Sequence, residues 1–147
     1  MKHVVCALLL VLPLLAGCLH GRGDQLPRHV QVFGFQLAER NDVRQLNGET
    51  GTDEPCLHGY ERSFEQQGVT VGYRRDGVVR RILTRNPSTG VFGISPGMST
   101  AQAAERAQQA GCRQSDGNVY RCGDSISIKL LVDENGRLFA IALEMAE

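Results

Sequence analysis

The stretch SISIKLLVDENGRLFAIAL, residues 125–143, is typical of a β-hairpin that buries one face. Apolar and polar side chains alternate through its first half, which is the period of a half-buried strand. The dipeptide Asn135-Gly136 follows, and this pair is preferred in two-residue hairpin turns because both positions adopt a positive φ. Apolar side chains then resume at alternate positions. We therefore expect two paired strands whose buried residues are Ile126, Ile128, Leu130, Val132, Phe139, Ile141 and Leu143.

A second stretch, GVTVGYRRDGVVRRILT at residues 68–84, has the same organisation, with Asp76-Gly77 as its turn. A tetrapeptide also recurs before each hairpin, Val-Phe-Gly-Phe at 32–35 and Val-Phe-Gly-Ile at 91–94. Such self-similarity indicates an internal repeat. The composition changes to Pro, Ser and Gly at residues 86–90, which favours a boundary there. We therefore predict two tandem units, residues 30–86 and residues 87–147.

A helix is predicted before the hairpin of the second unit. Ser99 can cap its first turn, and Gln102 completes a capping box. A stripe of small side chains, which permits close approach to a sheet, then follows at Ala103, Ala104, Ala107 and Ala110. Gly111 ends the helix.

The first unit has a more polar counterpart at residues 37–46, ended by Gly48, which we also interpret as a helix. Together these elements predict an α+β fold. Two tandem α-β-β(-β) units would form one antiparallel sheet, with the helices packed on one face.

The N-terminal residues predict a lipoprotein signal peptide at 1–17. Residues 4–16 form an apolar run, which is shorter than the ~20 residues that a membrane-spanning helix needs. The run ends in Leu15-Ala16-Gly17-Cys18, which resembles the lipobox of bacterial lipoproteins. The resemblance implies that Cys18 is acylated, with chains such as palmitate. Because Leu19 rather than Asp follows, it also favours the outer membrane, facing the periplasm. Residues 18–29 are then the lipidated cysteine and a flexible tether.

Gly97-Met98-Ser99 opens the second predicted helix, and a hairpin follows. In a small lipoprotein this arrangement resembles the SmpA/OmlA family, the accessory lipoproteins of the outer-membrane β-barrel assembly machinery. The doubled unit resembles the β-lactamase inhibitor protein fold, which is built from two such modules. Both resemblances cover residues 30–147, and both imply a binding protein rather than an enzyme.

Three cysteines remain in the predicted domain once Cys6 is removed with the signal peptide and Cys18 is acylated. They are Cys56, Cys112 and Cys122. The cell envelope is oxidising, so a disulfide is expected, and three pairings are possible. Cys112 and Cys122 are the closest in sequence and flank a short polar segment between a helix and a strand. We therefore predict that these two are paired, and whether Cys56 is free stays open.

Composition and motifs give little support for nucleic-acid binding or catalysis. Lys and Arg total 16, as do Asp and Glu, so the chain has no general basic excess. Residues 93–97 match the G-x-S-x-G pattern of hydrolases, but Pro96 lacks the N–H that an oxyanion hole needs, and every histidine precedes Ser95. Cys56 and His58 could form a nucleophile and base, although we interpret their spacing as coincidence. No metal-ligand spacing is present, and no cofactor or small-molecule substrate is evident.

The sheet face opposite the helices is the candidate binding site. With Asp76-Gly77 as a two-residue turn, alternate residues of each hairpin point away from the core. Apolar side chains rimmed by positive charge on an uncovered sheet face predict a protein-binding surface. The candidate residues are Arg74, Val79, Arg81, Leu83, Lys129, Leu131 and Leu138. The alternative is that loops or the chain termini cover this face.

The sequence thus predicts an outer-membrane lipoprotein that reaches the membrane through its N-terminal lipid anchor. Its periplasmic domain would be a non-enzymatic protein-binding module, a scaffold or assembly accessory whose partner is another envelope protein. The alternative is an inhibitor or immunity protein that blocks an envelope hydrolase, as the doubled fold suggests. No metal, cofactor, nucleic acid or small-molecule substrate is expected.

Overall fold

The computed structural model describes residues 30–146. The predicted signal peptide, the lipidated Cys18 and the tether therefore lie outside the described residues. Within the described part, no helix is both long and apolar enough to cross a membrane.

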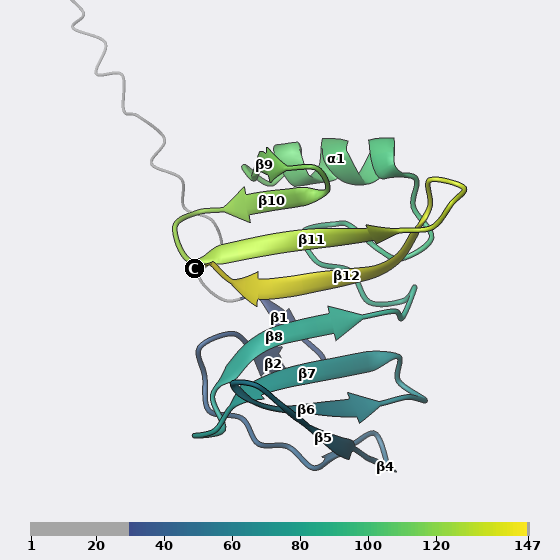
Figure 1. The fold of residues 1–147 in the computed structure, drawn as a ribbon. Helices are drawn as coiled ribbons and strands as arrows, with labels where there is room; N and C mark the ends of the chain where they lie inside the picture. Colours follow the sequence, from purple (N-terminus) through teal and green to yellow (C-terminus); the bar gives the residue numbers. More distant parts are fainter. Residues whose placement is uncertain (1–29, 147) are drawn as a thin grey trace, which may run out of the picture.

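An eight-stranded antiparallel sheet is the largest element (Figure 1). In chain order its strands are β5 (Thr52–Cys56), β6 (Gly59–Phe64), β7 (Val69–Arg74), β8 (Val79–Thr84), β9 (Arg113–Asp116), β10 (Val119–Cys122), β11 (Ile126–Val132) and β12 (Leu138–Met145). Their order across the sheet is β5-β6-β7-β8-β12-β11-β10-β9. Each predicted unit thus contributes four consecutive strands, and the two sets meet where β8 pairs with β12.

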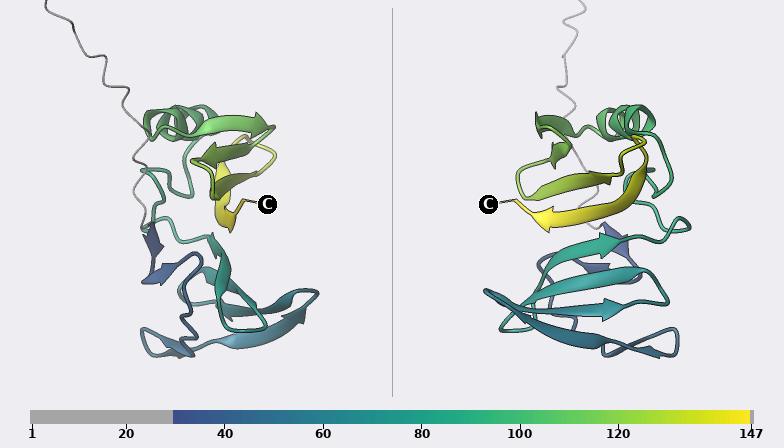
Figure 2. Two further views of the ribbon diagram at one scale, coloured as in Figure 1. Left: turned by 90° about the vertical axis from the view of Figure 1, so that its left-hand side faces the viewer. Right: turned by 45° about the vertical axis from the view of Figure 1, so that its right-hand side comes forward.

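The remaining elements lie on one side of this sheet (Figure 2). They are two short hairpins and one helix: β1 (Gln31–Val32) with β2 (Phe35–Gln36), β3 (Gln45–Leu46) with β4 (Glu49–Thr50), and α1 (Thr100–Gln109). The main apolar core lies between them and the sheet. Its largest fully buried apolar side chains include Phe35, Phe64, Tyr73, Ile82, Ile94, Ile128, Ile141 and Leu143.

The predicted α+β class is wrong, because the described chain is mostly β with a single short helix. Residues 37–46 do not form a helix. Ala38 has φ +66°, and Asn47 and Gly48, at +50° and +85°, form the two-residue turn of the β3–β4 hairpin. Such a turn fits the Asn-Gly pair better than a helix end does. This segment also lacks the alanine stripe that allows α1 to pack closely.

The second predicted helix is confirmed as α1. The Ser99 side chain accepts a hydrogen bond from the backbone N–H of Gln102, and the Gln102 side chain accepts one from the Ser99 backbone N–H. Ala103 and Ala107 are fully buried against the core. Gly111, at φ +82°, follows the end of the helix, where a glycine adopts this conformation without strain.

Both long hairpins turn through three residues rather than the predicted two. Arg74 donates to the carbonyl of Val78, and Asp133 donates to that of Arg137. Each hairpin then has a bulge, at Arg80 in β8 and at Phe139 in β12. The extra turn residue and the bulge compensate, so the register beyond each bulge is the one that a two-residue turn would give.

On the strand that follows each turn, the residues before the bulge are therefore on the opposite face from the one predicted. Val79 pairs with Tyr73, and Leu138 pairs with Val132. Val79 and Leu138 are both buried in the main core. The prediction that Val79 and Leu138 lie on the uncovered face is wrong. Phe139, which we expected in the core, is 49% exposed.

Arg62 is the one charged side chain that is fully buried among the described residues. Its guanidinium donates to both carboxylate oxygens of Asp53, at 2.5 and 2.7 Å, and to Asp42 at 2.5 Å. A further bond reaches the Val43 carbonyl at 2.9 Å. The group also lies 5.5 Å from the ring centre of Tyr73, within range of a cation–π contact. Arg62 therefore holds the segment around residue 42 against the core side of β6.

This ion cluster predicts acid sensitivity. Hydrogen bonds from Arg62 hold the pKa of Asp42 and of Asp53 below the usual 3.8, although partial burial opposes the shift. Carboxylates with a lowered pKa stabilise the folded state above about pH 4, and that contribution is lost as the pH falls through their folded-state pKa. Urea unfolding at a series of pH values should therefore show a steep loss of stability below pH 4.

Asp53→Asn should make the free energy of unfolding depend less steeply on pH in this range, because the variant takes up about one proton fewer on unfolding. Glu134→Gln, an exposed side chain at the β11–β12 turn outside the cluster, is the matched control for the loss of a carboxylate. Equal slopes for the wild type and Asp53→Asn would contradict the assignment.

Candidate functional site

The sheet face opposite α1 and the short hairpins is concave, and no helix or hairpin of residues 30–146 covers it (Figure 2, left view). We call it the open face. The strand registers place the following side chains on it: Glu54, Glu61, Thr70, Arg81, Leu83, Ser127, Lys129, Leu131, Ala140, Ala142 and Glu144. This face spans both halves of the sheet.

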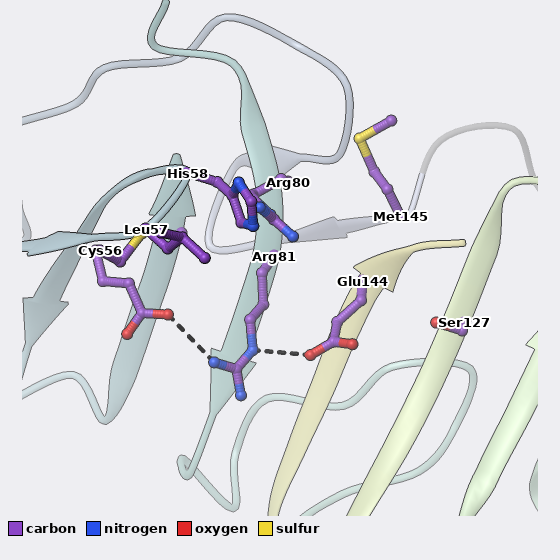
Figure 3. A pocket seen from close by; sticks show the side chains of 10 residues that line it. Cys56, Leu57, His58, Arg80, Arg81, Ser127, Glu144 and Met145 are labelled. Atoms are coloured by element: carbon purple, nitrogen blue, oxygen red, sulfur yellow. Dashed lines mark hydrogen bonds and ion pairs between the residues drawn. The ribbon is translucent and has the colours of Figure 1, made fainter. Parts of the chain in front are cut away.

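An ion-pair cluster lies at its centre (Figure 3). Arg81 Nη1 lies 3.2 Å from a carboxylate oxygen of Glu61, and Arg81 Nε lies 3.0 Å from one of Glu144. Glu144 is the direct cross-strand neighbour of Arg81. Glu61 is two strands away, and Arg81 reaches it because Gly72, on the strand between them, has no side chain. A Cβ atom at Gly72 would lie only 3.2 Å from the Cβ of Arg81.

A small apolar cluster lies beside these charges. Leu83 is 7% exposed, and Ala140 and Ala142 are fully buried although they point toward the open side. Leu131 packs against this cluster and is partly exposed. Alanines on a concave face are shielded by their larger neighbours, so this cluster adds an apolar floor beside the ion-pair cluster.

A hollow of about 460 Å³ lies at one end of the open face, between the β5–β6 turn and the end of β12 (Figure 3). Its lining residues are Cys56, Leu57, His58, Glu61, Gly72, Arg80, Arg81, Ser127, Glu144 and Met145. Leu57, at the tip of the two-residue turn, is 82% exposed. Over residues 30–146 no group of three or more His, Cys, Asp or Glu side chains could hold a metal ion.

The structure brings together four of the predicted binding residues, since Arg81, Leu83, Lys129 and Leu131 share the open face. Arg74 lies at the end of β7, where its guanidinium pairs with Asp76 at 3.0 Å. Val79 and Leu138 belong to the core instead. That the remaining five residues bind a partner stays a prediction.

Sequence reasoning missed the two carboxylates that hold Arg81. Glu61 lies on β6, a strand that we did not anticipate, although Tyr60, Arg62 and Phe64 alternate with polar residues in a strand-like period. The charge of Arg62 interrupted that signal. Glu144 is the residue directly after the hairpin stretch 125–143, so the predicted return strand ended one residue before it.

The predicted disulfide between Cys112 and Cys122 is present, and it joins the segment after α1 to the end of β10. Both cysteines are buried, whereas Cys56 is a free and exposed thiol in the hollow.

Comparisons with known proteins gave no match: no family model, no curated protein and no solved structure is similar to this chain at a significant level.

The cysteine arrangement predicts a difference in reactivity and in stability. Iodoacetamide should alkylate Cys56 in the native protein, and Cys112 and Cys122 only after reduction, as peptide mapping by mass spectrometry can show. Cys112→Ala with Cys122→Ala should lower the free energy of unfolding by about 2–3 kcal/mol, because a closed loop restricts the unfolded chain. Cys56→Ala is the matched control and should change it by less than ~0.5 kcal/mol. Alkylation of Cys112 without reduction would contradict the pairing.

Proposed function

We propose that this protein is a non-enzymatic binding module that docks another protein of the bacterial envelope on its open sheet face. The observation that carries the proposal is a broad sheet that residues 30–146 cover on one face only. The other, concave face has an ion-pair cluster at its centre and the partly exposed Leu131 near it (Figure 2). An uncovered apolar patch surrounded by charge is typical of a surface that a partner covers.

The architecture of this face supports binding in a defined geometry. Arg81 is held between two carboxylates, so its side chain loses little further freedom when a partner contacts it. Leu131 supplies the apolar surface that an incoming side chain would desolvate, because it is partly exposed, whereas Leu83, Ala140 and Ala142 beside it are already buried. Lys129 is exposed on the same strand, as expected for the edge of an interface.

The envelope location is part of the proposal and rests on the N-terminal sequence. A lipid anchor at Cys18 would attach the chain to the periplasmic side of the outer membrane, and residues 19–29 would connect the anchor to the domain. Because two or three acyl chains bind a bilayer strongly, the domain would meet its partner close to the membrane surface. The role that fits is a scaffold or assembly accessory.

Leu131→Asp and Lys129→Glu test the proposed surface. Chemical crosslinking in intact cells identifies the partner, and calorimetry with the purified pair then gives the dissociation constants. Each substitution should weaken binding by about 1–3 kcal/mol, the range for well-placed interface residues. Glu105→Lys, on the exposed side of α1, is the control for a charge change away from the open face.

Thermal melts separate loss of binding from loss of folding. Leu131→Asp and Lys129→Glu should cost no more than about 1 kcal/mol of stability, since neither side chain is fully buried. Ile128→Asp should prevent folding, because Ile128 is fully buried and an unpaired carboxylate there has no solvent. The surface is misassigned if Leu131→Asp melts like Ile128→Asp, or if it binds the partner as the wild type does.

Cys18→Ser tests the anchor. Without the thiol no diacylglycerol can be attached, and we expect an unprocessed precursor about as long as the full chain. Cys6→Ser, within the predicted signal peptide, should be processed normally. Intact-mass spectrometry and membrane fractionation report both outcomes. Retention of Cys18→Ser in the outer-membrane fraction after high-salt washing would refute the anchor.

A further inference from the structure

We draw no further inference here: the strongest candidate, the hollow at the end of the open face between the β5–β6 turn and the end of β12, carries nothing further, because its free thiol at Cys56 is a lone cysteine and no other feature of residues 30–146 shows what would occupy the hollow.

Discussion

β8 and β12 pair over four residues, from Thr84 opposite Ile141 to Arg81 opposite Glu144. This pairing joins the two four-stranded halves into one sheet, and both faces of the sheet depend on it. On the core side it places Ile82 beside Leu143. On the open side it places Leu83 beside Ala142, next to the ion pair of Arg81 with Glu144. The centre of the proposed binding surface is therefore the junction itself, and neither half contains that surface alone.

The two halves cover their core faces by different means. The second half uses α1, whose alanines let it lie close to the sheet. The first half has no helix and uses two short hairpins, β1–β2 and β3–β4. Arg62 fixes the chain between these hairpins through Asp42 and the Val43 carbonyl, and links it to β5 through Asp53. A buried guanidinium is stable there because its donors meet carboxylates and a carbonyl.

Local signals in the sequence were enough to predict much of the second half. The alternation around Ile128, the capping box at Ser99 and the spacing of Cys112 and Cys122 each act within a few residues, and the structure contains the strand, the helix and the disulfide. The helix predicted at 37–46 was wrong because it was inferred by analogy with the second unit, whereas Asn47-Gly48 forms the turn of a short hairpin. Val79 and Leu138 were assigned to the wrong face because they lie between a three-residue turn and a bulge. The two irregularities shift the register in opposite directions, so the alternation beyond the bulge gives no sign of either. The pairing of β8 with β12, and with it the ion pair of Arg81 with Glu144, depends on contacts between distant residues that no local pattern encodes.

Lys129 offers the most direct test of the account, because it is the only lysine after Lys2 and lies on the open face. The rate at which an amine-reactive reagent modifies this side chain can be measured by mass spectrometry, for the free protein and for the complex with its crosslinked partner. If the open face is the binding surface, modification of Lys129 should be slow in the complex and fast in the free protein. Equal rates in the two states would show that the partner binds elsewhere.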